Sequence, residues 1–224
     1  MPAETMRFHR RRSGARVTTR VTTRVTTRVA AATAVFVMAV AACSTEPPDS
    51  GPPVVPDDPL SFVVVGGPFA RASADRGGSD ETWPQRLFRK VLPPGTSYVN
   101  LGRTSFRLAE AGELGPDLNR LAPQLVIVWA GEDDVAAGLN PERFATGYAD
   151  LLRRLVAPNR RILVATLPGV DPGYNAAITS AAIGVNATVV DLATRIDPAD
   201  VTGGRLSPRA NEQVAAAFQP ALGA

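Results

Sequence analysis

The sequence has almost no histidine and almost no cysteine. One of each occurs in 224 residues, His9 and Cys43, and both lie near the amino terminus. The chain after residue 43 therefore has no imidazole to act as a general base and no pair of thiols to close an internal disulfide. A domain built from it must rest on its own core, and histidine-dependent hydrolysis is excluded there.

Acidic residues are scarce at the amino terminus. Residues 1–28 contain eight arginines and a single acid, Glu4, and the uncharged run that follows, residues 29–42, has 14 residues. That run is too short to cross a bilayer as an ordinary helix, whereas a basic segment before a short apolar one is typical of a secretory signal peptide. We therefore expect residues 1–42 to be a signal peptide that is removed on export.

The basic character of the whole chain belongs to this leader. It holds eight of the 24 basic residues and one of the 21 acids, so residues 43–224 carry 16 basic and 20 acidic residues, a net charge of −4. Arginines do not cluster with aromatic residues there, so no nucleic-acid partner is expected. The repeat VTTRVTTRVTTR at residues 17–28 is interpreted as a lengthened basic region or an over-called start codon, with a surface-seeking basic helix as the alternative.

The leader ends in the sequence VAAC, whose cysteine is Cys43. This ending resembles the lipobox of bacterial lipoproteins, which implies lipidation of Cys43 and anchoring to the outer face of the cytoplasmic membrane or the cell envelope. An ordinary cleaved signal with a stray thiol is the alternative. Six prolines lie between Ser44 and Pro59, and this composition predicts an extended tether over residues 43–59 that reaches roughly 50 Å from the lipid.

Residues 60–224 alternate short apolar runs with helical patterns. The runs are rich in valine and isoleucine, as strands buried on both faces should be, and they span residues 60–65, 97–101, 124–130, 161–167 and 187–192. Helices are expected over residues 80–92, with Pro84 in the first turn, over 140–156, with Asn140 as the N-cap, and after Ser207. This alternation predicts an α/β fold, an open parallel sheet of about five strands with helices on both faces.

Four segments carry a resemblance to a known family: FVVVGGPFA from residue 62, YVNLGRTS from residue 98, VWAGEDDV from residue 128 and GRLSPRANEQVAAAF from residue 204. They resemble the four sequence blocks of the SGNH or GDSL hydrolases, which are Gly-Asp-Ser, a glycine, Gly-x-Asn-Asp and Asp-x-x-His. Those enzymes are esterases and acylhydrolases with a flavodoxin-like three-layer sandwich. The resemblance extends over residues 60–222 and implies that fold for this chain.

The resemblance also implies that the catalytic groups are replaced. The nucleophile matches Pro68, the oxyanion-hole asparagine matches Asp133, the acid matches Gly204 and the histidine matches Ser207, so that only Gly102 keeps the family's residue. Proline offers neither a hydroxyl nor an N–H, and an ionised aspartate accepts hydrogen bonds where the family's asparagine donates them. The resemblance therefore implies the fold of a hydrolase, whereas the residues at the catalytic positions predict that the chain does not hydrolyse esters by the family's mechanism.

Each remaining residue of the site also has a structural explanation. We expect Ser207 to be the N-cap of the last helix, and Gly66, Gly67 and Gly102 to permit turns at strand ends. Glu132, Asp133 and Asp134 are expected to form a solvated acidic loop, in which Asp134 bonds loop backbone. A cation site built from these three acids is the alternative, but no partner ligands are identifiable, so no metal and no cofactor are expected.

Three classes of function stay open. The first, which we favour, is a lipid-anchored binding protein with an inactive hydrolase fold, whose cleft takes an envelope glycan, lipid or protein ligand. That cleft would be lined by Gly66, Gly67, Gly102, Glu132, Asp133 and Asp134. The second is an active esterase with a relocated nucleophile, for which the candidates are Ser73, Ser79, Ser105 and the sole lysine, Lys90. The third is an interaction protein that uses an arginine-rich surface formed by Arg153, Arg154, Arg160 and Arg161.

Overall fold

The computed structural model describes residues 59–71 and 82–222. The predicted leader, Cys43 and the tether up to residue 58 lie outside the described residues, as do Ser73 and Ser79. Within the described ranges, none of the helices has both the length and the apolar composition that crossing a membrane requires.

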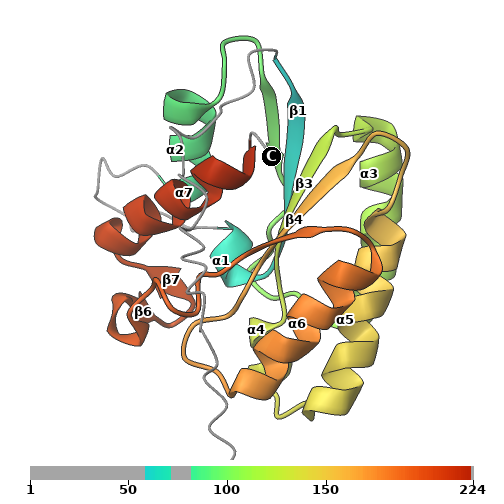
Figure 1. Ribbon diagram of the computed structural model, residues 1–224, viewed down its shortest axis with the longest axis vertical. Coiled ribbons are helices and arrows are strands. Elements are labelled where there is room, and N and C mark those ends of the chain that lie inside the picture. The colour runs from blue at the N-terminus through green and yellow to red at the C-terminus, as the bar shows by residue number, and fades with distance from the viewer. Residues whose placement is uncertain (1–58, 72–81, 223–224) are drawn as a thin grey trace, which may run out of the picture. The chain divides into compact units, whose positions relative to one another are not determined.

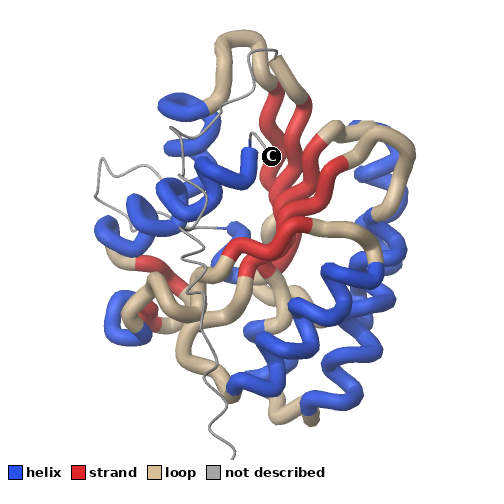
Figure 2. Tube along the Cα trace, viewed as in Figure 1, coloured by secondary structure: helices blue, strands red, loops and turns tan. Residues whose placement is uncertain are grey.

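A five-stranded parallel sheet forms the centre of the domain (Figure 2). The strand order is β2-β1-β3-β4-β5, so the chain winds first to one side of β1 and then to the other. Val63 of β1 lies opposite Val99 on β2 and Val126 on β3. The strands are β1 (Ser61–Gly66), β2 (Ser97–Asn100), β3 (Leu125–Trp129), β4 (Arg161–Ala165) and β5 (Thr188–Val190). The five predicted strands and the flavodoxin-like class are thereby confirmed.

Helices cover both faces of this sheet (Figure 1). One layer contains α2 (Trp83–Arg86), the π-helix η1 (Leu87–Val91) and α7 (Pro208–Leu222); the other contains α3 (Gly115–Leu121), α5 (Pro141–Leu155) and α6 (Pro172–Gly184). The shorter elements are α1 (Pro68–Arg71), the 3-10 helices η2 (Leu108–Leu114) and η3 (Pro198–Asp200), α4 (Glu132–Ala136), and the paired strands β6 (Val201–Thr202) and β7 (Arg205–Leu206). The domain is therefore a three-layer sandwich.

Helix α5 begins as its sequence predicts. The Oδ1 atom of Asn140 accepts a hydrogen bond from the Arg143 N–H at 2.9 Å, and Pro141 occupies the first helical position, where no N–H is needed. Phe144, Tyr148 and Leu152 fall on one stripe and are fully buried against the sheet. The apolar spacing and the cap thus agree on where this helix starts and which face it buries.

The helix predicted over residues 80–92 is shorter and less regular than expected. It begins at Trp83, and its second half widens into the π-helix η1, in which the Leu92 N–H donates to the Leu87 carbonyl at 3.0 Å. The register change keeps Leu87 fully buried. An i, i+4 pattern alone does not distinguish a π-turn from an α-turn, so this departure could not be predicted from spacing.

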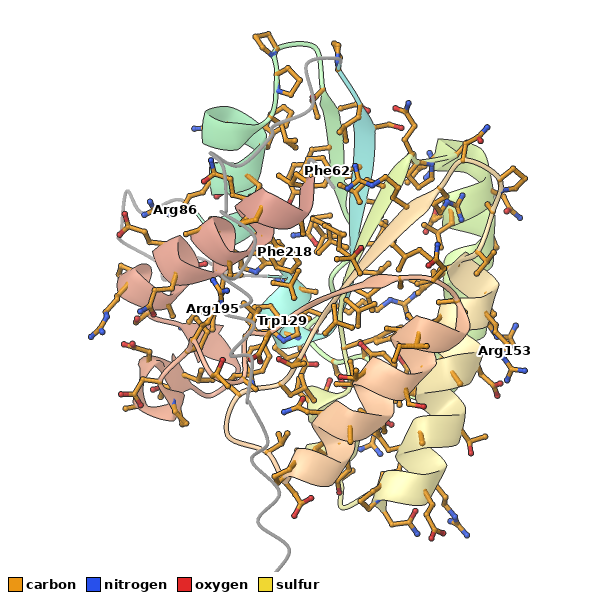
Figure 3. The ribbon with its side chains drawn as sticks, viewed as in Figure 1. Phe62, Arg86, Trp129, Arg153, Arg195 and Phe218 are labelled. Carbon is orange, nitrogen blue, oxygen red and sulfur yellow. The ribbon has the colours of Figure 1, made fainter. Side chains whose placement is uncertain are left out.

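Trp83 joins the helices of one layer to the sheet. Its ring stacks on Phe218 of α7 with centroids 5.1 Å apart and meets Trp129 of β3 edge-on at 6.0 Å. Figure 3 labels Phe218 and Trp129. Its Nε1–H donates to the Phe69 carbonyl at 2.9 Å, and its backbone N–H donates to Asn211 Oδ1 at 2.9 Å. One buried side chain therefore connects α1, α2, α7 and β3.

Substitution Asn211→Ala tests this connection. Asn211 accepts from the Trp83 N–H and donates to the Leu206 carbonyl, both in a buried setting, and it also donates to the Ser207 carbonyl. Its loss leaves the buried Trp83 N–H without a partner, and we expect the free energy of unfolding in urea to fall by about 1–3 kcal/mol. The neighbouring exposed substitution Glu212→Ala should change it by less than about 0.5 kcal/mol. Equal effects of the two changes would contradict the assigned role of Asn211.

Candidate functional site

The predicted site residues meet at the carboxyl edge of the sheet. Pro68 begins α1 directly after β1, Gly102 follows β2, and Glu132 begins α4 after β3. The Arg103 N–H donates to the Gly66 carbonyl at 3.0 Å, which joins the segments after β1 and β2. Parallel strands deliver their carboxyl ends to one edge, so three separate stretches of sequence converge here.

Glu132 turns inward onto the segment that follows β1. Its Oε1 accepts a hydrogen bond from the Phe69 N–H at 3.1 Å. A Cβ atom on Gly67 would lie 2.6 Å from the same Oε1, so the carboxylate occupies the space that a side chain at residue 67 would need. Gly67 forms the bend between β1 and α1, and a side chain there would also displace the Glu132 carboxyl group.

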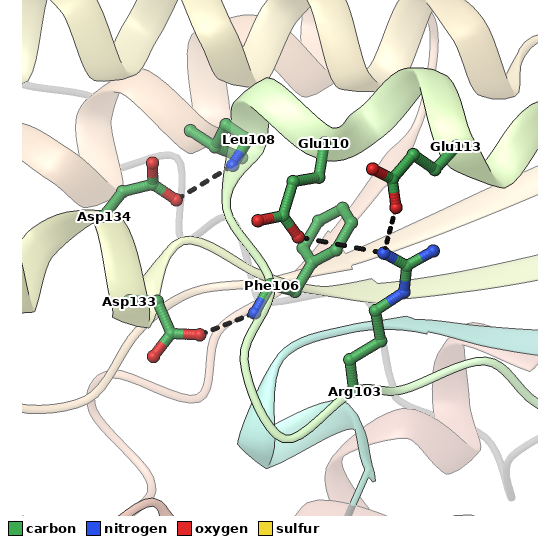
Figure 4. Close-up of polar contacts among 7 residues, drawn as sticks. All are labelled: Arg103, Phe106, Leu108, Glu110, Glu113, Asp133 and Asp134. Atoms are coloured by element: carbon green, nitrogen blue, oxygen red, sulfur yellow. Dashed lines mark hydrogen bonds and ion pairs between the residues drawn. The ribbon is translucent and has the colours of Figure 1, made fainter.

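Asp133 and Asp134 bind the segment that follows β2 (Figure 4). Asp133 Oδ2 accepts from the Phe106 N–H at 2.7 Å, and Asp134 Oδ2 accepts from the Leu108 N–H at 3.1 Å. Asp134 is only 5% exposed. The expectation of a solvated acidic loop is therefore wrong: the three acids form the first turn of α4, and each accepts one backbone N–H from a distant segment. The expectation that Asp134 bonds local loop backbone is also wrong, because its partner Leu108 lies 26 positions away and begins η2.

These hydrogen bonds also bear on the cation alternative. In the described part of the chain, no three His, Cys, Asp or Glu side chains are grouped so that they could hold a metal ion. Glu132, Asp133 and Asp134 each direct an oxygen at a different backbone N–H, so they diverge instead of converging on one point.

Gly66 and Gly102 allow close backbone approaches. Gly66 has φ of +140°, and a Cβ there would lie 1.8 Å from the Trp129 carbonyl oxygen, so no other residue fits. At Gly102 a Cβ would lie 2.3 Å from the Arg71 nitrogen, although its φ is not positive. The Gly102 N–H donates to Asn100 Oδ1 at 2.7 Å. Gly102 is thus required for packing against α1, not for a turn.

The last block lies against the start of α1. Gly204 has φ of +75°, and a Cβ there would lie 2.8 Å from Pro68 Cβ, so the β6–β7 turn rests directly on Pro68. Ser207 Oγ donates to Asp200 Oδ1 at 2.9 Å and accepts from the Ala210 N–H at 3.0 Å. The latter bond confirms Ser207 as the N-cap of α7.

The sequence of this domain matches a known protein family. A model of the GDSL-like lipase/acylhydrolase family matches residues 63–212, which is more than half of the chain. The chain belongs to the GDSL-like lipase/acylhydrolase family. No curated protein matches the sequence significantly.

Solved structures of the GDSL family share the fold at low sequence identity. The crystal structure of TesA matches with a TM-score of 0.61 at 17% identity, covering 72% of this chain and 97% of that one. A family 3 carbohydrate esterase from Clostridium thermocellum gives 0.57 at 20% identity, covering 72% and 94%. A lipase/acylhydrolase from Enterococcus faecalis gives 0.58 at 14% identity, covering 73% and 95%. The likeness establishes the fold of this GDSL-family chain.

Several predicted candidates lie elsewhere. Ser105 is exposed in the segment after β2, and the side chain of Lys90 lies outside what the structure describes. The proposed arginine-rich surface is only partly a surface. Arg160 donates to the carbonyls of Pro123 and Leu155, at 3.1 and 2.9 Å, and Arg161 donates to those of Ala221 and Leu222, each at 2.7 Å. These two arginines are bonded to backbone carbonyl groups of the domain itself, which corrects the expectation that all four arginines form an interaction surface.

Burial changes the ionisation of Glu132. Its Oε2 is buried with no hydrogen-bond partner among the described residues. Burial raises the pKa of Glu132 to about 8; the Phe69 N–H opposes this rise, and the charges of Asp133 and Asp134 add to it. The buried hydroxyl of Tyr148 also lacks a partner in the described chain, and its pKa is raised by burial and by Glu132. At neutral pH the carboxyl of Glu132 is therefore mostly protonated.

Some residues of the site had no signal in the sequence. Asn100, Phe69 and Tyr148 contribute a side-chain acceptor, a backbone donor and a buried hydroxyl, yet each lies in an apolar strand or helix pattern that gives it no special status. Asp200 bonds Ser207, and only its position before the last block could have suggested this pairing.

Substitution Glu132→Gln should alter how stability depends on pH. Because the folded-state pKa of Glu132 lies above the ordinary value of 4.5, its contribution to stability is complete below about pH 4.5 and is lost as pH rises to about 8. The wild-type free energy of unfolding should fall across that window by at most about 1.4 kcal/mol per pH unit from this group, and Glu132→Gln should remove that slope. Denaturation in urea at several pH values measures it. The exposed change Glu142→Gln is the control, and an unaltered slope in Glu132→Gln would refute the assignment.

A double-mutant cycle should detect the packing of Gly67 against Glu132. Gly67→Ala should lower the free energy of unfolding by about 1–3 kcal/mol, because the new methyl group collides with a buried carboxyl. In a Glu132→Ala background the same change should cost much less. Gly115→Ala, where a Cβ meets nothing within 4 Å, serves as the control. Additive effects of the two substitutions on the free energy of unfolding would mean that the Glu132 side chain is not the reason why alanine is unfavourable at residue 67.

Proposed function

We propose that this GDSL-family chain is an exported, lipid-anchored protein that binds a ligand and does not hydrolyse esters. One observation carries the proposal: at the three positions that match the family's oxyanion-hole donors, no free donor is left. Pro68 has no N–H, the Gly102 N–H is bonded to Asn100 at 2.7 Å, and Asp133 accepts from Phe106. Without such donors the negative charge that develops during ester cleavage has no stabilisation.

The residues at the positions of the family's histidine and acid also support the proposal that esters are not hydrolysed. The residue that matches the family's histidine is Ser207, whose Oγ is occupied by Asp200 and the Ala210 N–H. The residue that matches the acid is Gly204, which lies so close to Pro68 that any side chain there would collide. The change from a catalytic acid to glycine therefore agrees with the close packing of this turn.

Glu132 makes the same place unfavourable for an anion. Its carboxyl group lies over Gly67 and takes the Phe69 N–H, the first backbone donor after Pro68. When ionised, it would repel the charge of a tetrahedral intermediate; when neutral, it still occupies the space. The site thus contains an internal acid where a substrate oxygen would have to bind.

The lipoprotein part of the proposal rests on the sequence. The basic leader, the 14-residue apolar run and the VAAC ending at Cys43 support export and acylation, and the proline-rich residues 44–59 support a tether. Two acyl chains are enough for stable anchoring, whereas one is marginal. An envelope glycan, lipid or protein is the class of ligand that such a location offers.

One observation favours a second candidate, an interaction protein that uses a surface away from the family's catalytic positions. The contact of Gly204 with Pro68 and the packing of Gly102 on α1 fill the space between the segments after β1 and β2 and the β6–β7 turn. A ligand would then bind at another cavity of the domain. A binding role and a scaffold role share the prediction that esters are not hydrolysed.

Hydrolysis of short-chain nitrophenyl esters by residues 44–224 tests the proposal. We expect no turnover above the buffer rate, because the donors and the base are absent. Ser73→Ala, Ser79→Ala and Ser105→Ala variants are the controls for a relocated nucleophile. Turnover that one of these substitutions abolishes would establish an active esterase and would overturn the proposal.

A further inference from the structure

A cavity of about 370 Å³ lies between η2 and α5, on the far side of the segment that Asp133 and Asp134 bind. Its charged lining residues come from three segments: Arg107 precedes η2, Asp134 belongs to α4, and Arg143, Asp150 and Arg154 follow one stripe of α5. Leu108, Ala111 and Leu139 provide apolar walls. The cavity therefore combines positive groups with an apolar surface.

The two acids of this cavity are already engaged. Asp150 forms an ion pair with Arg153, which does not line the cavity. Asp134 is buried and accepts the Leu108 N–H, and its pKa is raised by burial, although that hydrogen bond and the nearby Arg107 oppose the rise. Neither acid forms an ion pair with a guanidinium of the cavity in the described part of the chain.

Other arginines on this side of the domain do find partners. Arg103 pairs with Glu113, Arg120 pairs with Asp117, and Arg160 donates to three backbone carbonyls. Within the described ranges, Arg107, Arg143 and Arg154 form no such ion pair or side-chain hydrogen bond. Residues 43–224 hold 20 acids and 16 bases, yet none of the acids that the structure describes is hydrogen-bonded to these three arginines.

We infer that this cavity binds a phosphate ester. A guanidinium presents a planar fork of N–H donors that matches phosphate oxygens in pairs, and such charge-assisted bonds are the stronger ones. The volume, about 12 times the share of one water in the liquid, accommodates a phosphate together with a small organic group, and the apolar walls suit the latter. This inference does not depend on whether the chain hydrolyses esters.

Two sources could supply this chemistry, a phospholipid headgroup or a soluble phosphate ester. The probe for the second is glycerol 3-phosphate, with glycerol as the uncharged control. Vesicles of phosphatidylglycerol, with phosphatidylcholine vesicles as the control, probe the first. The protein is residues 44–224, so that neither acylation of Cys43 nor the basic and apolar residues 1–42 can attach it to membranes. Binding of glycerol 3-phosphate alone identifies a soluble ligand, and binding of both probes in competition identifies the headgroup.

Calorimetric titration of the variant Arg143→Gln/Arg154→Gln provides the decisive comparison. Both residues are exposed at the two ends of α5, so the fold should be retained, which thermal unfolding checks. We expect the affinity for glycerol 3-phosphate to fall about tenfold or more, since each lost charge-assisted hydrogen bond weakens binding by such a factor. Arg120→Gln, an exposed arginine on α3, should leave it unchanged. The inference would be overturned if the parent chain did not bind glycerol 3-phosphate, or if Arg120→Gln lowered the affinity as much as the double substitution does.

Discussion

The hydrogen bond from the Phe69 N–H to Glu132 determines how the carboxyl edge of this sheet is built. It joins α1 to α4, and the Glu132 carboxyl group takes the space beside Gly67 that a side chain would fill. The next two acids continue the same function: Asp133 and Asp134 bind Phe106 and Leu108, so three consecutive carboxyl groups join the segments that follow β1, β2 and β3. The acidic run is therefore a structural clamp. It lies where the segments that match the GDSL family's sequence blocks converge, and it occupies the Phe69 N–H there.

Fold and chemistry separate clearly in this chain. The buried strands depend on apolar residues such as Val63, Val126 and Val164, none of which takes part in ester hydrolysis, so the sheet persists at 14–20% identity to the solved structures compared here. Function depends on a few polar groups at the strand ends, and those can change without cost to the core. The proposed loss of hydrolysis is coupled to compensating changes: the β6–β7 turn packs on Pro68, and Glu132 packs on Gly67.

The sequence predicts those features that are locally determined. The five strands, the Asn140 cap and the Ser207 cap follow from residues within a few positions of one another, and all are present. The site was predicted less well, because its contacts join distant residues: the partner of Glu132 lies 63 positions away, and those of Asp133 and Asp134 lie 27 and 26 away. A run of three acids indicates a solvated loop unless those partners are known. Arg160 and Arg161 were misjudged for the same reason, since the carbonyls that they bind belong to other segments.

The central claim is that no serine of residues 44–224 acts as an esterase nucleophile. Reaction of residues 44–224 with a fluorophosphonate, followed by intact-mass measurement, tests it most directly, because the reagent forms a stable ester with an activated serine whatever the natural substrate is. The account predicts an unchanged mass under conditions in which an active esterase of the same fold is fully labelled. A stoichiometric adduct that maps to a single serine would contradict it.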